Sequence, residues 1–195
     1  MRIFLIILIF ILSLQAWTKA DDISDFEIEG MSIGDSLLDY LSKDEILQSE
    51  TKYYPGSKKF KQVALYDRIK METYDVVSVA LKDNDKNYII HEIKGFKRFP
   101  NHELCLNNRD EVVKDLKNLF NTNSYKINSY ESTTAQDENS VFKSVDFEFS
   151  MGLIRLYCIN WSKKIREDKG GFYDDSLTIL IYDNEFKNFL KKAYN

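Results

Sequence analysis

The sequence predicts a two-layer α+β domain in which a mainly antiparallel sheet of meandering strands carries helices packed on one face. Apolar and polar residues alternate over several short segments, the pattern of half-buried strands. Consecutive strands are joined by short turns, which require antiparallel neighbours. Segments with helical spacing of apolar residues follow two successive blocks of strands, so helices would cover the sheet.

The first 20 residues predict a secretory signal peptide. A basic start precedes an uncharged apolar run at residues 3–14, and small residues precede an expected cleavage between Ala20 and Asp21. The run is shorter than the roughly 20 apolar residues of a membrane span. We therefore expect a periplasmic or secreted protein with no stable membrane insertion after cleavage, an uncleaved anchor being the alternative. Residues 21–195 would form a single domain.

The charge balance excludes one class of partner. The chain carries 27 basic and 31 acidic residues, and loss of the leader would make the domain more acidic. An acidic surface argues against nucleic acid as a partner. The sequence indicates no other partner and no oligomeric state.

The domain is expected to open with short helical segments. Gly34 and Asp35 end a turn that leads into a helix, with Asp35 or Ser36 as its N-cap. Ser42 and Glu45 have the spacing of a capping box, which predicts a second short helix.

Alternation predicts three strands in the first block, at residues 60–66, 74–82 and 88–96, with a hairpin loop at 84–87. An amphipathic helix is expected from Asn108 to residue 120, because its apolar residues recur at helical spacing.

The second block begins with a polar segment at residues 121–140, which predicts a mobile loop or a protruding hairpin. Strands are expected at 142–149, 153–161 and 177–182, and a C-terminal helix at 185–194. The two blocks raise the alternative of an internal duplication, which no sequence identity supports.

The tetrapeptide Gly34–Leu37 resembles the signature of GDSL esterases and lipases, in which the serine is the nucleophile. Such a Ser hydrolase needs a histidine base, which that family supplies from a DxxH motif near the C-terminus. The chain has two histidines, His91 and His102, and neither lies in such a motif. A helix cap explains Ser36 without any chemistry, so the Ser hydrolase is the disfavoured alternative.

No other motif predicts a catalytic residue, a metal site or a cofactor. The chain lacks CxxC and HExxH spacings and a phosphate-binding loop. We expect His91 to be a partly buried strand residue and His102 an exposed loop residue. Cys105 and Cys158 would form a disulfide in an oxidising compartment, free buried thiols being the alternative.

Several segments resemble small secreted proteins of marine alphaproteobacteria of the Pelagibacter type. They include IEGMSIGDSLLDY at residues 28–40, NDKNYII at 84–90 and CINWS at 158–162. The resemblance implies a periplasmic location and paired cysteines, and leaves the activity open. The leading hypothesis is a non-enzymatic binding or interaction domain, acting through its sheet face or polar loop. A structural subunit of an envelope assembly is a further alternative.

Overall fold

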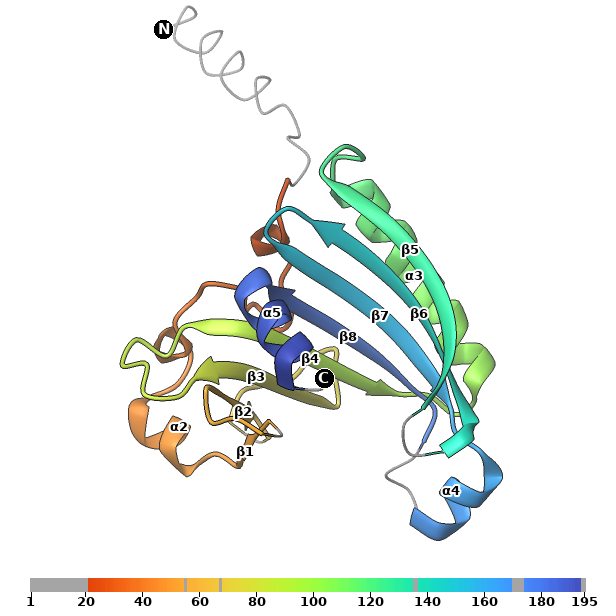
Figure 1. Ribbon diagram of the computed structural model, residues 1–195, viewed down its shortest axis with the longest axis horizontal. Coiled ribbons are helices and arrows are strands. Elements are labelled where there is room, and N and C mark those ends of the chain that lie inside the picture. The colour runs from red at the N-terminus through yellow and green to blue at the C-terminus, as the bar shows by residue number, and fades with distance from the viewer. Residues whose placement is uncertain (1–20, 55, 67, 135–136, 170–173, 194–195) are drawn as a thin grey trace, which may run out of the picture.

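The fold is a single antiparallel sheet with helices on both sides (Figure 1). It is seen in a computed structural model that describes residues 21–54, 56–66, 68–134, 137–169 and 174–193. The eight strands follow the order β1-β2-β3-β4-β8-β7-β6-β5. The predicted leader and Ala20 lie outside the described residues.

The helical segments are η1 (Ile23–Asp25), η2 (Leu37–Asp39), α2 (Lys43–Gln48), α3 (His102–Leu119), α4 (Lys163–Lys169) and α5 (Asn184–Ala193). The strands are β1 (Thr51–Tyr53), β2 (Phe60–Ala64), β3 (Val76–Lys82), β4 (Ile90–Arg98), β5 (Tyr125–Thr134), β6 (Asp137–Phe149), β7 (Gly152–Asn160) and β8 (Ser176–Asp183).

The predicted α+β class and the antiparallel meanders are confirmed. Strands β1 to β4 form one meander and β5 to β8 the other, and the two join where β4 pairs with β8. Strand β1 was not predicted, because its three residues are all exposed and show no apolar alternation.

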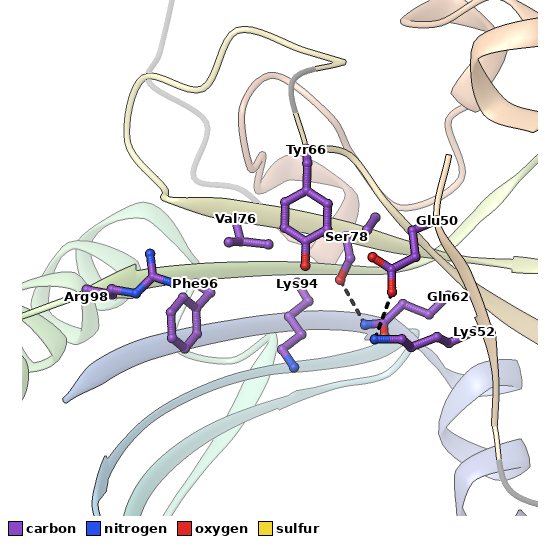
Figure 2. A pocket seen from close by; sticks show the side chains of 10 residues that line it. Glu50, Lys52, Gln62, Tyr66, Val76, Ser78, Lys94, Phe96 and Arg98 are labelled. Atoms are coloured by element: carbon purple, nitrogen blue, oxygen red, sulfur yellow. Dashed lines mark hydrogen bonds and ion pairs between the residues drawn. The ribbon is translucent and has the colours of Figure 1, made fainter. Parts of the chain in front are cut away.

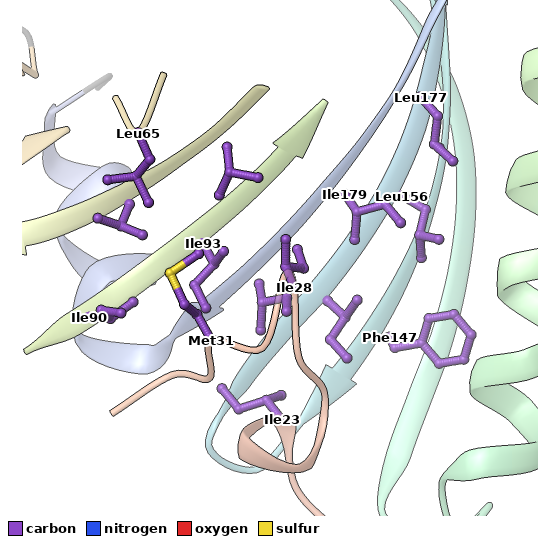
Figure 3. Packing of buried hydrophobic residues seen from close by; sticks show 14 of the residues in the cluster. Ile23, Ile28, Met31, Leu65, Ile90, Ile93, Phe147, Leu156, Leu177 and Ile179 are labelled. Carbon is purple, nitrogen blue, oxygen red and sulfur yellow. The ribbon is translucent and has the colours of Figure 1, made fainter. Parts of the chain in front are cut away.

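The larger core cluster lies between the sheet and a layer made of α3 and the N-terminal segment (Figure 3). Ile23, Ile28 and Met31 of that segment are buried against the strands. Val113 and Leu116 of α3 bury the stripe that its apolar spacing predicts. Burying such side chains stabilises the fold by roughly 1.5–3 kcal/mol each.

A second, smaller core cluster lies on the opposite face under α5, so the expectation of helices on one face needs correction. Phe186 and Phe189 of α5 are buried there, against apolar residues of the sheet: Phe60, Ala80, Leu153 and Tyr182. The sheet is thus apolar on both faces at this end, and a second helix is needed to cover it. Because α3 and α5 lie on opposite faces, a simple duplication of strands plus helix does not describe the chain.

The disulfide prediction is confirmed. Cys105 of α3 is bonded to Cys158 of β7, and their Cα atoms are 6.1 Å apart. The bond ties the first turns of α3 to the centre of the sheet. Within the described residues, no helix combines the length and apolarity that a membrane crossing requires.

Two helix starts differ from prediction. Helix α3 begins at His102 rather than Asn108, because the Asn101 side chain accepts a hydrogen bond from the Leu104 amide and caps the helix there. The segment after Ser36 forms one turn of 3-10 helix and not a longer α-helix. The capping box of Ser42 and Glu45 is confirmed.

Of the two alternatives for residues 121–140, the structure forms the hairpin. Ten residues of β5 pair with β6, from Tyr125 opposite Phe149 to Thr134 opposite Asp137. Most of β5 is exposed. Backbone hydrogen bonds hold such an edge strand without an apolar pattern, and so the composition of the segment indicated a loop.

Candidate functional site

Ser36 acts as a helix cap. Its hydroxyl accepts a hydrogen bond from the Leu38 amide at 3.2 Å and donates one to the Asn87 carbonyl at 2.6 Å. No histidine hydrogen-bonds to this hydroxyl in the part of the chain that the structure describes. The geometry therefore provides no base for a serine nucleophile.

His91 has a structural partner. Its ring is buried in β4, as predicted, and Nδ1 lies 2.6 Å from the Asp183 carboxylate. The other oxygen of Asp183 accepts a hydrogen bond from the Phe186 amide. The pair therefore joins the sheet to the start of α5.

His102 lies in the first turn of α3, so the prediction of an exposed loop residue is wrong. Both ring nitrogens are buried without a hydrogen-bond partner among the described residues, and Nδ1 is 4.0 Å from the Asp175 carboxylate. Burial lowers the pKa of His102. The helix cap at Asn101 draws this residue into α3 and out of the loop.

No group of three or more metal-ligating side chains is present among the described residues. Neither histidine is therefore placed in a metal site. The remaining candidate is the surface of the sheet itself.

The open face is the part of the α5 side of the sheet that α5 leaves uncovered. Strand register places alternate residues of each strand on this side, so that Ser78, Lys94 and Leu180 form one row across β3, β4 and β8. Val76, Phe96 and Thr178 form the next row. These rows mix polar, aromatic and aliphatic side chains, in contrast to the apolar face under α3.

A hollow of about 350 Å³ lies on the open face over β1 to β4 (Figure 2). Its floor is low because Ala64 and Ser78, opposite each other on β2 and β3, are small. Longer side chains surround them. The lining consists of Glu50, Lys52, Gln62, Ala64, Tyr66, Val76, Ser78, Lys94, Phe96 and Arg98.

The hollow is electropositive in an acidic protein. Its lining holds three cations and one carboxylate, whereas the whole chain has a net charge of −4. Lys52 pairs with Glu50 at 3.0 Å. Lys94 forms no ion pair among the described residues, and Arg98 has only a contact of 3.9 Å with Asp174. The two cations of β4 are therefore available to an anion.

Aromatic and amide groups complete the lining. Figure 2 shows Tyr66 between Val76 and Ser78, with its hydroxyl directed toward β4. The Arg98 guanidinium lies 5.5 Å from the centre of the Phe96 ring. The Gln62 amide donates a hydrogen bond to the Ser78 hydroxyl at 2.9 Å. The hollow thus combines apolar surface with a few convergent polar groups, as small-molecule sites do.

Glu92 lies next to the hollow on the same side of β4, but under α5. It is buried and accepts a hydrogen bond from the Tyr54 hydroxyl at 2.7 Å. Burial raises the pKa of this carboxyl, and the Tyr54 hydrogen bond and Lys94 oppose the change. Because its pKa is raised, Glu92 ionises less readily than an exposed carboxyl, and it forms no ion pair with Lys94 among the described residues.

The sequence predicted a binding role for the sheet face or the polar loop, but none of the residues of the hollow. The available signal was the second face of the strand predicted at 88–96, where Glu92, Lys94 and Phe96 alternate with Ile93 and Gly95. The prediction of this strand assigned no function to that face.

Comparison with known proteins gives no relative from which a function could be transferred. No family model matches the chain, and neither the curated proteins nor the solved structures contain a match. The functional conclusion therefore rests on the geometry of the hollow.

Proposed function

We propose that the protein is a ligand-binding domain that holds a small anionic molecule in the hollow on the open face of its sheet. The observation that carries the proposal is Lys94, a half-buried cation without an ion-pair partner among the described residues, on the wall of a hollow with aromatic lining. Taking a charge from water is costly unless it is compensated. An anionic ligand would supply the missing compensation.

The size and lining of the hollow support a small molecule. Its volume of about 350 Å³ lies at the lower end of the range of roughly 300–1,000 Å³ for ligand pockets. Phe96 and Tyr66 would contact the apolar part of the ligand, while Gln62 and Ser78 offer hydrogen-bonding groups. Such a site orients a ligand, and the described residues around it include no nucleophile paired with a base.

The compartment that we propose is the periplasm or the extracellular space. The Cys105–Cys158 disulfide supports an oxidising compartment, and the leader predicted at residues 1–20 would direct export. A domain that binds small anions there would act as a carrier or sensor of solutes outside the cytoplasm.

Calorimetric titration with octanoate tests the proposal. We expect the native protein to bind it, and Lys94→Met to weaken binding at least about tenfold, as the loss of a hydrogen bond to a charged group does. Lys97→Met is the matched control, because Lys97 lies on the same strand opposite Leu177 and so faces the α3 side. The proposal would be contradicted if both variants lost the same affinity for octanoate, or if the native protein did not bind octanoate.

A further inference from the structure

We infer that the hollow accepts an elongated dianion of the α,ω-dicarboxylate class, with one carboxylate at Lys94, the other at Arg98, and the apolar chain between them over Phe96. The inference rests on the proposed function and specifies its ligand. It follows from three features of β4: the spacing of its cations, their lack of strong partners, and the residue between them.

The spacing follows from strand geometry. Lys94, Phe96 and Arg98 alternate along β4 and therefore project from the same side of the sheet. Four residues of strand span about 13 Å. A single carboxylate cannot contact the strand at both positions, whereas a chain with a carboxylate at each end can lie along β4 and reach both side chains.

The charges favour two anionic groups over one. Glu50 already compensates Lys52, at 3.0 Å. Lys94 has no ion pair among the described residues, and Asp174 contacts Arg98 only at 3.9 Å, with about half of each side chain exposed. Two cations thus remain, one for each end of a dianion, and a monoanion would leave one of them uncompensated.

The middle of the site is apolar. Phe96 lies between the two cations on β4, and Val76 is directly opposite it on β3. Tyr66 adds a third apolar surface beside Val76 (Figure 2). An aliphatic chain would bury apolar area against these three side chains, whereas a compact dianion would leave them exposed to water.

The experiment compares three probes of equal chain length by calorimetry: octanedioate, octanoate and octane-1,8-diol. We expect octanedioate to bind at least about tenfold more tightly than octanoate, since it gains a second charge-assisted contact, and the diol to bind most weakly. Lengthening the diacid from butanedioate to dodecanedioate should give maximal affinity at an intermediate length.

Two variants locate the carboxylates. Lys94→Met and Arg98→Met should each reduce the affinity for octanedioate to that of octanoate, while the control Lys97→Met should bind both probes like the native protein. Circular dichroism establishes that each variant is folded. If the native protein bound octanedioate and octanoate with equal affinity, the inference of a dianionic ligand would be wrong, while the proposed anion site would stand. Absence of binding by both acids would overturn the proposed function as well.

Discussion

Glu92 shows how a single buried carboxyl couples this fold to pH. Its pKa is raised by burial, against the opposing effects of the Tyr54 hydroxyl and Lys94, whereas the reference pKa of such a carboxyl is 4.5. Between these two pKa values the folded state holds a proton that the unfolded state releases. The contribution of Glu92 to stability is therefore complete below pH 4.5 and is lost as the pH rises through the folded-state pKa.

We predict that Glu92→Gln stabilises the protein at neutral and alkaline pH and reduces the fall in stability with rising pH. Glutamine keeps the shape and remains neutral, so the difference in unfolding free energy between native protein and variant should grow by up to about 1.4 kcal/mol per pH unit. Chemical denaturation from pH 4 to pH 9 measures it. An identical pH profile for native protein and Glu92→Gln would contradict the raised pKa of Glu92.

A second prediction at this scale concerns Ser36. Because its hydroxyl caps η2, Ser36→Ala should destabilise the protein by about 1 kcal/mol. A fluorophosphonate probe should not label the native protein, since no histidine hydrogen-bonds to this hydroxyl among the described residues. Labelling of the native protein that disappears in Ser36→Ala would show that the serine is a nucleophile.

At the scale of elements, the start of α5 depends on Asp183. One carboxylate oxygen accepts a hydrogen bond from the Phe186 amide at 2.7 Å, and the other lies 2.6 Å from His91. Glu185 in the first turn adds ion pairs with Lys59 and Lys82. These contacts hold the helix that separates the second core cluster from water.

We predict that Asp183→Ala destabilises the protein by about 1–3 kcal/mol and increases hydrogen exchange in α5 more than in α3. The variant loses both the cap and the histidine pair. Asp183→Asn retains a good N-cap residue, so it should lose less stability. The difference in unfolding free energy between the two variants measures the contribution of the cap. Equal exchange in α3 and α5 would mean that α5 does not open separately.

The disulfide between α3 and β7 should contribute to stability without determining the fold. Cys105 and Cys158 are 53 residues apart, and closing such a loop restricts the unfolded chain by about 4 kcal/mol in the chain-entropy estimate. We expect the double variant Cys105→Ser/Cys158→Ser to melt at a lower temperature while keeping the far-ultraviolet circular dichroism of the native protein. A free thiol detected in the denatured, unreduced native protein would contradict the bond.

Periodicity predicted most elements, and its failures have identifiable causes. Strands β3, β7 and β8 bury one or both faces and were located by their apolar residues. Strand β5 was predicted only within one of two alternatives, a hairpin or a loop, because an edge strand is held by backbone hydrogen bonds, which leave little trace in composition. The opposite placement of α3 and α5 could not be predicted, since helical spacing identifies the apolar stripe of a helix and not the face of the sheet that it meets.

At the scale of the whole molecule, the two faces of the sheet have different roles. One face is covered by α3 and the N-terminal segment and forms the larger core cluster (Figure 3). The other is covered by α5 at one end and left open beyond it (Figure 1). The hollow exists because a short helix covers a broad sheet incompletely.

The candidate site was only partly accessible from the sequence. A binding role for the sheet face or the polar loop was expected, because the sequence shows no nucleophile–base pair or ligand cluster. The hollow itself brings together Glu50, Tyr66, Ser78 and Lys94 from separate parts of the first meander. Its composition depends on strand register and on the length of α5, which local patterns do not define.

The central claim is that the hollow is the anion-binding site, and an NMR titration of the isotope-labelled protein with octanoate tests it most directly. We predict that the largest shift changes fall on the amides of residues 76–78 and 94–98 and saturate together, and that Lys94→Met needs at least about ten times more octanoate to reach half saturation. Saturable changes centred on α3 or on the β5 hairpin, or changes at the hollow that reach half saturation at the same octanoate concentration in Lys94→Met as in the native protein, would contradict it.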